Sequence, residues 1–379
     1  MARAGDVHLS EAELALLDET ATLARHALAP IAAEGDEGRV NVALLRALGA
    51  RGLLARVLRP DVSAMDLCLI REGLARGCTE AETAFAVQGL GARPILQWGG
   101  EAIAELWRDG LAAGDVAAGF ALTEPGAGSD VAALSLTAER SGEDWVLTGE
   151  KAFISNAPDA AVYSVFARTG PGEGARGLTA FAVTGDSEGL RGERIDLVSP
   201  HPIGRLRFER VQVPGDHRLG EVGGGFRVAM ATLDLFRPSV GAFAIGMAQA
   251  ALDAAVDHAS ARHAFGRPLR EFQAVSHRLA DVATRVQAAR LLVHHAARAY
   301  DAGLRGRDYG QAAAMAKLLA TEVAQDAVDA AVQVHGARAL ERGHLLEHLY
   351  REVRAPRIYE GASEIQREII ARQLFAARD

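Results

Sequence analysis

The chain of 379 residues contains only two cysteines, Cys68 and Cys78, in a stretch with an apolar, helical pattern. Two thiols cannot form a disulfide framework or a four-thiolate metal site, so we expect buried free thiols. The first residues contain no apolar signal core, and no apolar run reaches membrane-spanning length. We therefore expect a soluble, cytoplasmic protein that does not bind a membrane.

Lysine is nearly absent as well, with only Lys151 and Lys317 among a large excess of arginines. We interpret this imbalance as a coding bias. The formal net charge is −8 and the cationic residues are spread along the chain, which argues against a nucleic-acid-binding surface. A hydrophobic fraction of 49% is enough for a substantial core.

The first part of the chain, residues 1–115, has a helical pattern. Ser10-Glu11-Ala12-Glu13 predicts a capping box that opens a helix ending at Pro30, and Asn41 predicts the cap of a shorter helix. Further helices are expected at 61–77, 79–89 and 103–111. This pattern predicts an N-terminal all-α domain.

The middle part, residues 116–222, alternates β-branched and aromatic residues with polar ones. Strands are expected at 117–122, 134–140, 145–154, 163–168, 178–183 and around Val211. Short strands without intervening helices indicate an antiparallel β-barrel or sandwich domain.

The last part, residues 223–379, is helical again. Helices are expected at 226–261, with an interruption at Pro238, and at 272–303, 309–335, 345–354 and 363–377. Three long helices with short connections predict a C-terminal four-helix bundle. The fold class is therefore α+β, with an α-helical domain on each side of a β domain.

A carboxylate stands on a short turn between two of these helices. Glu360 lies between Tyr359 and Gly361, and Ser363 is a plausible N-cap for the helix that follows. Gly361 lets the backbone turn tightly or approach a ligand. A fixed carboxylate in this setting suits a general base that removes a proton from carbon, although a surface glutamate would have the same local pattern.

Four further motifs could contact a ligand. Residues 121–130, Ala-Leu-Thr-Glu-Pro-Gly-Ala-Gly-Ser-Asp, offer backbone N–H groups and hydroxyls, without the spacing of a dinucleotide or P-loop motif. Phe153 and Ser155 share one face of a strand and could flank a planar ring. Arg262 could hold a phosphate and Phe265 could lie against a base. Gln333 and Gly336 lie at the end of a helix, where they could meet a pyrophosphate or a ribityl chain.

One metal motif is rejected. His344, Glu347 and His348 have the spacing of a zinc peptidase helix, but too little chain follows for a third ligand and its domain. We expect no metal site.

In this order, the motifs resemble the acyl-CoA dehydrogenase family over nearly the whole chain, most weakly before residue 114. Residues 121–130 are close to one family signature, and residues 358–366, Ile-Tyr-Glu-Gly-Ala-Ser-Glu-Ile-Gln, are close to another. Arg-x-x-Phe-Gly at residues 262–266 lies between them.

The resemblance implies FAD, a three-part α/β/α fold and a homotetramer built as a dimer of dimers. It implies that the flavin ring is surrounded by Leu122, Thr123, Ser129, Phe153 and Ser155. It implies that Arg262, Phe265 and Gln273 meet the ADP half of FAD from the neighbouring subunit, and that Gln333 and Gly336 also serve the cofactor. It implies a substrate site formed by Ser129, Asp234, Arg237, Tyr359 and Gly361.

The resemblance also implies the reaction. Glu360 matches the catalytic base, which removes the α-proton of an acyl-CoA while a β-hydride passes to flavin N5. Some family members carry the base on the helix that begins near Gly225, where this chain has Phe236. The expected product is the trans-2-enoyl thioester of a short- or branched-chain acyl-CoA, and the expected electron acceptor is an electron-transfer flavoprotein.

Three departures from the family pattern keep alternatives open. Gly336-Ala337-Arg338-Ala339 replaces Gly-Gly-x-Gly, Ala362 replaces a threonine, and residues 59–61 replace a longer Pro-Glu-x-x-Gly-Gly stretch. One alternative is a dehydrogenase of acyl groups tethered to a carrier protein. Others are a non-catalytic structural relative with weak FAD binding, or an oxidase that passes electrons to oxygen.

Overall fold

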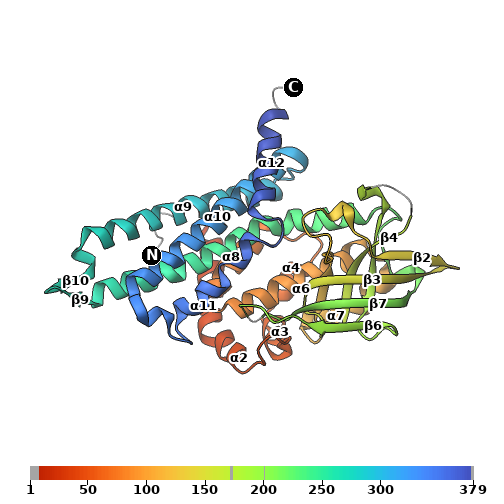
Figure 1. Cartoon of the computed structure of the whole chain (residues 1–379), viewed down its shortest axis with the longest axis horizontal. Coiled ribbons are helices and arrows are strands. Elements are labelled where there is room, and N and C mark those ends of the chain that lie inside the picture. The colour runs from red at the N-terminus through yellow and green to blue at the C-terminus, as the bar shows by residue number, and fades with distance from the viewer. Residues whose placement is uncertain (1–7, 171–173, 200, 377–379) are drawn as a thin grey trace. The chain divides into compact units, whose positions relative to one another are not determined.

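The computed structural model describes residues 8–170, 174–199 and 201–376 (Figure 1). The chain divides into two compact units. The first consists of Met1–Ala29, Ser63–Glu82 and Asp234–Asp379, and the second of Pro30–Val62 and Thr83–Leu233. The division into three domains at residues 115 and 222 stays a prediction.

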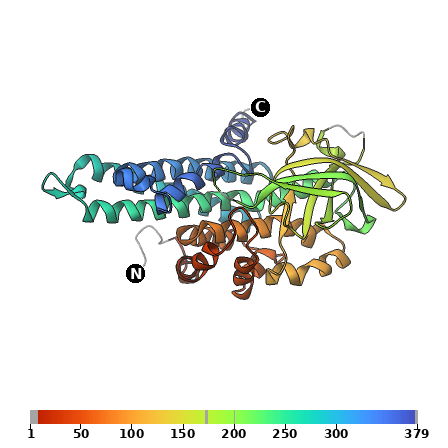
Figure 2. The ribbon, with the colours of Figure 1, turned by 60° about the horizontal axis from the view of Figure 1, so that its bottom comes forward.

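The first unit is helical. Its elements are α1 (Glu11–Leu23), α2 (Ala29–Ala33, which crosses into the second unit), α5 (Ala64–Gly77), the start of α6 (Thr79–Trp98), most of α8 (Gly225–Ala261), α9 (Gln273–Asp301), α10 (Gly306–His335), α11 (Leu345–Glu352) and α12 (Ser363–Ala376). The helices α8, α9 and α10 run side by side (Figures 1 and 2). Gly241 permits this packing, because a Cβ there would lie 2.7 Å from Val293 of α9 and 3.3 Å from Ala320 of α10.

The first helical segment begins as predicted but does not end where expected. Ser10 and Glu13 form the predicted capping box. The expected end at Pro30 is wrong, because a π-helical turn at Ala24–Leu28 leads into α2, which contains the proline. The wider turn changes the hydrogen-bond pattern ahead of the proline ring, where a regular α-helix would place a clashing carbonyl.

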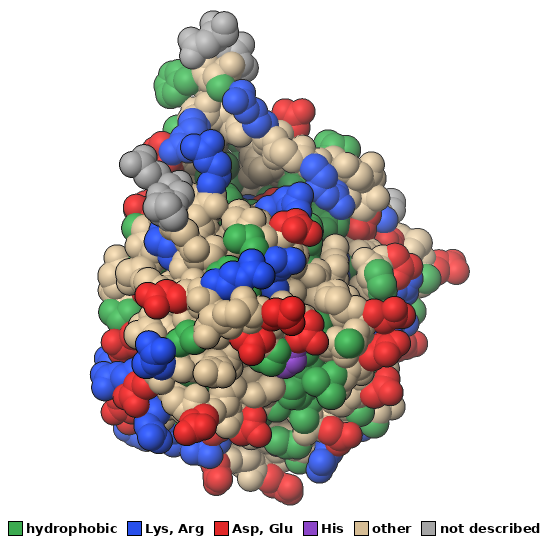
Figure 3. All heavy atoms as spheres, turned by 90° about the vertical axis from the view of Figure 1, so that its right-hand side faces the viewer, with side chains coloured by type: hydrophobic (Ala, Val, Ile, Leu, Met, Phe, Trp, Pro, Cys, Tyr) green, Lys and Arg blue, Asp and Glu red, His purple; other side chains and the backbone are tan. Residues whose placement is uncertain are grey.

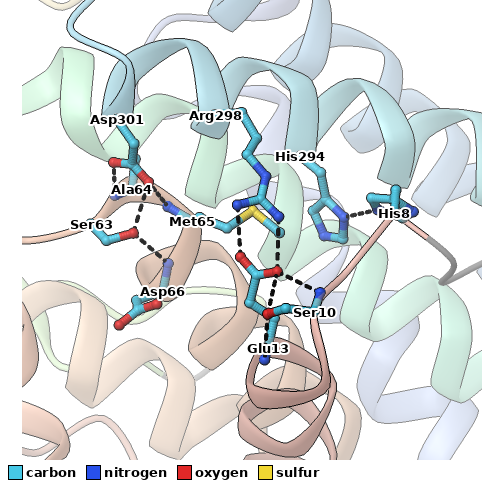
Figure 4. Close-up of polar contacts among 10 residues, drawn as sticks. All are labelled: His8, Ser10, Glu13, Ser63, Ala64, Met65, Asp66, His294, Arg298 and Asp301. Atoms are coloured by element: carbon cyan, nitrogen blue, oxygen red, sulfur yellow. Dashed lines mark hydrogen bonds and ion pairs between the residues drawn. The ribbon is translucent and has the colours of Figure 1, made fainter. Parts of the chain in front are cut away.

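The C-terminal end of α9 holds the beginnings of α1 and α5 (Figure 4). The Asp301 carboxylate accepts hydrogen bonds from the first two backbone amides of α5, at 2.7 and 3.0 Å, and from the Ser63 hydroxyl at 2.7 Å. Arg298 pairs with Glu13 at 2.8 Å. A negative charge at a helix N-terminus satisfies free N–H groups and interacts favourably with the helix dipole.

The structure bears on two expectations drawn from the composition, the state of the cysteines and the length of the apolar runs. Cys68 and Cys78 are both buried and free, as predicted. Among the described residues, α8 is long and apolar enough to cross a membrane by length and composition, which corrects the expectation that no run reaches that length. However, 78% of its most apolar stretch is buried inside the protein, as in the core helix of a globular fold.

The second unit is built on an eight-stranded sheet. Its strands are β1 (Ala118–Ala121), β2 (Thr137–Ser141), β3 (Asp144–Ser155), β4 (Val162–Arg168), β5 (Leu178–Thr184), β6 (Leu190–Arg194), β7 (Ile203–Val213) and β8 (Arg218–Leu219). The order is β6-β7-β3-β2-β4-β5-β8, with β1 beside β4. The α+β class is confirmed, but the sheet is not wholly antiparallel, because β4 pairs in parallel with β1 and β2.

The middle of the sheet is buried on both faces. Tyr163 and Val165 of β4 belong to one apolar cluster, whereas Val162 and Phe166 belong to another. Successive side chains of a strand point to opposite faces, so β4 contributes to a core on each side. This explains why its sequence is apolar throughout rather than alternating.

Helices of this unit pack on the sheet. They are α3 (Val42–Ala50), α4 (Leu53–Leu58), α7 (Glu101–Ala113) and the rest of α6. The side chain of Gln88 in α6 donates to the carbonyls of Leu111 and Val116 and accepts from the amide of Ala118 at 3.0 Å. One buried amide side chain thereby links α6, the end of α7 and the start of β1.

On the face drawn in Figure 3, acidic and basic side chains of the chain are interspersed.

A buried ion pair anchors the loop after β1. The Lys151 ammonium donates to the Leu122 carbonyl at 3.0 Å and to the Glu124 carboxylate at 2.9 Å. Glu124 also accepts from the Ser135 hydroxyl and amide and from the Leu136 amide, at 2.7 to 2.9 Å. Burial lowers the pKa of Lys151 to about 8, and Glu124 opposes that shift. Both oxygens of the Glu124 carboxylate accept hydrogen bonds, and the ammonium has two acceptors, as a buried charge pair requires.

We expect Asp301→Ala to lower the free energy of unfolding by about 1–2 kcal/mol, since it removes the acceptor for three donors at the start of α5. Thermal and urea unfolding measure the change. The matched control is Asp186→Ala, an exposed aspartate without a hydrogen-bond partner among the described residues, which should change little. Equal effects of the two substitutions would contradict the capping role.

We expect Lys151→Met to be more damaging, by about 3–5 kcal/mol, because it leaves the Glu124 carboxylate buried without its counter-ion. The double variant with Glu124→Gln should recover part of the loss, and a double-mutant cycle on unfolding free energies measures the coupling. Arg207→Met, at an exposed position of β7, is the control. A Lys151→Met protein as stable as this control would show that the pair is dispensable.

Candidate active site

The turn that carries Glu360 is fixed by hydrogen bonds to one carbonyl. Glu360 has a φ of 50° and Gly361 a φ of 93°, so the chain passes through two left-handed positions before α12. The Gly361 carbonyl accepts from the Lys317 ammonium at 2.7 Å and from the Gln366 side-chain amide at 2.9 Å. A left-handed backbone is uncommon for glutamate and needs surrounding structure to hold it.

Ser363 does not cap α12, which corrects the prediction from its sequence position. It is the first helical residue, and its hydroxyl donates to Glu322 of α10 at 2.8 Å. Arg357 pairs with the same carboxylate at 2.8 Å. The hydroxyl therefore links the turn to α10 rather than to the free amides of its own helix.

The Glu360 side chain has an unused acceptor. Its Oε2 is shielded from solvent and has no hydrogen-bond partner among the described residues. The Glu360 backbone N–H likewise has no partner in the described part of the chain. Burial raises the pKa of the carboxyl, while Arg71, Arg237 and Lys317 act in the opposite direction. The residue thus presents a basic oxygen and a backbone donor that the protein itself does not use.

The arginines near Glu360 are themselves held in place. Arg71 of α5, 2% exposed, pairs with Glu82 and donates to Ser239 of α8 at 2.7 Å. Arg237 of α8 pairs with Asp234 at 3.0 Å.

The neighbouring positions complete the description of the base. The Asp234 carbonyl accepts from the Tyr309 hydroxyl, while Tyr359 next to the base is 37% exposed. Phe236, where some family members carry the base, is fully buried, so this position supplies apolar packing and no carboxylate. The predicted substrate residues of the first unit therefore gather around Glu360, whereas Ser129 belongs to the second unit.

In the second unit, the loop after β1 lies beside β3. Leu122 is buried, Thr123 is half-buried and Ser129 is exposed. The Thr123 carbonyl accepts from the Ala152 amide at 3.0 Å, which fixes the loop next to the strand. A Cβ at Gly126 or Gly128 would meet no atom within 4 Å, so the loop leaves open space on its outer side.

The strand β3 is irregular where the predicted flavin residues occur. Its register against β7 shifts between Lys151 and Ile154, and Phe153 there has a φ of 56° with 54% of its surface exposed. A bulge re-aims a side chain and often accompanies a functional site. Phe153 and the half-buried Ser155 lie on the less buried side of the strand, close to the loop of Thr123.

The other predicted cofactor residues gather at one end of the helical unit. Arg262, Phe265 and Gln273 are exposed around a hairpin of β9 (His263–Ala264) and β10 (Arg267–Pro268). Phe265 is 96% exposed and has a φ of 52°. Exposed Gln333 and Gly336 end α10, and the ends of α8 and α10 meet where His258 stacks on His335 at 4.2 Å.

This group is distant from Glu360. Lys317, which contacts the turn of Glu360, and Gln333 lie on the same helix α10, and their spacing in sequence corresponds to about 24 Å along the axis. The structure therefore does not bring the two sets of predicted residues of the first unit together within one chain.

The departure at residues 336–339 is smaller than its sequence suggests. Gly336 keeps the left-handed φ of 68° that favours glycine, with open space around it. Ala339 is 0% exposed, so its methyl group points into the protein. The added side chains that reach the surface are those of Ala337 and Arg338.

The rejected zinc motif is engaged elsewhere. Glu347 accepts from Arg351 at 2.7 Å, and His348 hydrogen-bonds to the Thr79 hydroxyl at 2.6 Å. Within the described ranges, no group of three His, Cys, Asp or Glu side chains could hold a metal ion.

Sequence reasoning missed the groups that support the site. The sequence assigns no role to four of them. Lys317 and Gln366 hold the turn of Glu360, Lys151 holds the loop after β1, and Arg71 contributes to the charge around the base. The sequence does contain a signal for the lysines, because the chain has only two. The structure shows that both are fully buried. From the composition alone, the scarcity of lysine indicates a coding bias and no site.

Comparison with known proteins identifies the family of the chain. Residues 10–115, 119–211 and 223–375 match the family descriptions "Acyl-CoA dehydrogenase" N-terminal, middle and C-terminal domain, respectively. The mitochondrial short-chain specific acyl-CoA dehydrogenase of Bos taurus is 38% identical, over 97% of this chain and 91% of that protein. The cyclohexane-1-carbonyl-CoA dehydrogenase of Geobacter metallireducens is 34% identical, over 93% of this chain and 94% of that protein.

Solved structures are similar over the same extent. Butyryl-CoA dehydrogenase from Megasphaera elsdenii superposes with a TM-score of 0.89 at 31% identity, covering 97% of this chain and 99% of that one. The FAD complex of PigA superposes with a TM-score of 0.91 at 25% identity, covering 98% and 99%. The chain therefore belongs to the acyl-CoA dehydrogenase family, whose members are FAD-dependent enzymes.

Proposed function

We propose that the protein oxidises short- or branched-chain acyl-CoA thioesters to their trans-2-enoyl thioesters, with Glu360 as the catalytic base. The short-chain enzyme and the cyclohexane-1-carbonyl-CoA enzyme among its relatives support this range of small straight and branched acyl groups.

The observation that carries the proposal is the pair of unused groups on Glu360. A thioester has a carbonyl oxygen that accepts hydrogen bonds and, one bond away, an α-carbon with an acidic hydrogen. Glu360 can serve both parts at once. Its backbone N–H can donate to the carbonyl oxygen, and its buried Oε2 can accept the α-hydrogen as a proton. A donor at the carbonyl stabilises the negative charge that develops when the α-proton leaves.

The residues present fit FAD. Exposed Phe153, held off the regular strand path, and the half-buried hydroxyls of Thr123 and Ser155 suit a flavin ring. Exposed Phe265 and Arg262, which has no side-chain partner among the described residues, suit an adenine and a phosphate. When bound, FAD supplies an acceptor for the β-hydride.

The protein's own residues contribute three things to the reaction. Glu360 takes the α-proton at its buried oxygen, and its raised pKa makes it a stronger base than an exposed glutamate. Its backbone N–H orients the carbonyl. Arg237, fixed by Asp234, is assigned to the thioester end of the substrate, and its charge favours the ionised form of the Glu360 carboxyl.

The distance along α10 supports an assembly of at least two chains. Lys317, which contacts the turn of Glu360, and Gln333 are about 24 Å apart along α10 of one chain. We infer that Arg262, Phe265 and Gln273 meet the FAD of a neighbouring subunit, in a homotetramer arranged as a dimer of dimers. An electron-transfer flavoprotein is the proposed acceptor, and a cytoplasmic location stays a prediction.

We expect Glu360→Gln to retain flavin but lose turnover by several orders of magnitude, because the amide cannot accept the α-proton. Flavin absorbance and steady-state rates measure the two properties separately. In the unchanged enzyme, kcat/KM should fall with decreasing pH at a value above the ordinary glutamate pKa, since only the ionised carboxylate is a base. Near-normal turnover of the variant would reject this base.

The activity itself is tested by the visible spectrum of the purified protein without oxygen, before and after a panel of acyl-CoA esters is added. Bleaching of the flavin by a short or branched ester is the expected result. Bleaching only by acyl groups on a phosphopantetheine carrier protein would support the carrier-linked alternative. Failure to take up FAD at all would favour a non-catalytic relative and reject the proposal.

A further inference from the structure

A buried lysine, Lys317, contacts the active-site turn, and the proposed reaction does not explain its role. Lys317 is 0% exposed, and its ammonium donates at 2.7 Å to the carbonyl of Gly361, the residue after the base. Burying an ammonium is costly unless it has a partner, and a single backbone carbonyl is a modest one. This cost requires a compensating role.

We propose that Lys317 is a positioning residue for the dehydrogenation, holding the Glu360 turn in its left-handed form and setting the charge around the base. The inference rests on the proposed function of Glu360. It assigns a separate role to a side chain on α10 that donates to the backbone of the turn rather than to the Glu360 carboxylate.

The positioning part follows from the geometry of the turn. The two backbone angles at Glu360 and Gly361 are both left-handed, and neither residue lies in a helix or strand that would fix them. Lys317 and Gln366 converge on the same carbonyl from α10 and α12. Two donors on one oxygen fix the orientation of the peptide after Glu360, and with it the direction of the carboxylate.

The charge part separates the two donors, because Gln366 is neutral and Lys317 is cationic. The groups that face Glu360 are Arg71 of α5, Arg237 of α8 and Lys317 of α10, and all three favour its ionised form. Those that face Lys317 are Glu360, Arg237, Glu322 of α10 and Glu364 of α12. Burial lowers the pKa of Lys317 to about 8, and the carboxylates oppose that shift.

The sign of the effect on Glu360 follows directly. A nearby positive charge stabilises the carboxylate and lowers its pKa, so removal of that charge raises it. Because the base works only when ionised, the pH below which flavin reduction slows should move upward when Lys317 becomes neutral. Removal of the neutral donor should leave that pH unchanged.

The test compares Lys317→Met with Gln366→Met, each of which removes one donor to the Gly361 carbonyl. The first readout is hydrogen–deuterium exchange of the peptide around residues 357–366 in the purified protein, which needs no activity. Both variants should exchange faster than the unchanged protein. The second readout is the rate of anaerobic flavin reduction by an acyl-CoA ester across pH.

We expect both variants to reduce flavin about 10- to 100-fold more slowly at neutral pH, since small misplacements of a catalytic group have effects of that size. Only Lys317→Met should also shift the acidic limb to higher pH. Unchanged exchange in both variants would overturn the positioning role. An identical acidic limb in both would overturn the electrostatic role.

Two controls keep these outcomes separate from other failures. If Lys317→Met does not fold, Lys317→Gln, which is neutral but polar, replaces it in the pH measurement with the same expected shift. If the unchanged protein binds FAD but is not reduced by any ester, the proposed function fails, and the exchange data still decide whether Lys317 holds the turn.

Discussion

The desolvated carboxylate of Glu360 is the constraint on which the architecture of the helical unit depends. A base buried without a hydrogen bond at Oε2 is unfavourable, since burial disfavours its charged form. The unit offsets this with cations supplied by α5, α8 and α10. Each cation must in turn be buried and partnered, so Arg71 is paired with Glu82, and Arg237 with Asp234. Local requirements of one side chain thereby dictate polar groups in the core of three helices.

The cost of burying charge also explains why lysine rather than arginine occurs at two positions. In a chain that uses arginine almost everywhere, the positions that kept lysine are fully buried and end on backbone carbonyls, those of Leu122 and Gly361. A compact ammonium can approach one carbonyl in a confined space, whereas a planar guanidinium with five donors needs more room and more acceptors. The two exceptions to the excess of arginine therefore mark the loops that hold predicted site residues in both units.

Much of the fold could be predicted because long helices have a strong periodic signal, and the capping residues Ser10 and Asn41 act within a few residues of themselves. The strand β6 is not predicted because it is mostly exposed. The strand β7 is predicted only around Val211, although its alternation of apolar with charged or polar residues is itself a strand signal. Ser363 occupies a position in the sequence that predicts a helix cap, but its hydroxyl donates instead to Glu322, which is distant in sequence. Interactions of that kind depend on tertiary structure and leave no local pattern.

Backbone strain gives evidence for the site that does not depend on family resemblance. Among the described residues, five that are not glycine have a left-handed φ, and three of them are Phe153, Phe265 and Glu360. Such positions cost roughly 1–3 kcal/mol each and persist only where the surroundings enforce them. For Phe153 and Phe265 the strain accompanies exposed aromatic surface, with 54% and 96% of the residue exposed, respectively. The folded chain thus stores energy at the residues that the motifs assign to the flavin, the adenine and the proton, as expected if bound ligands supply the missing contacts.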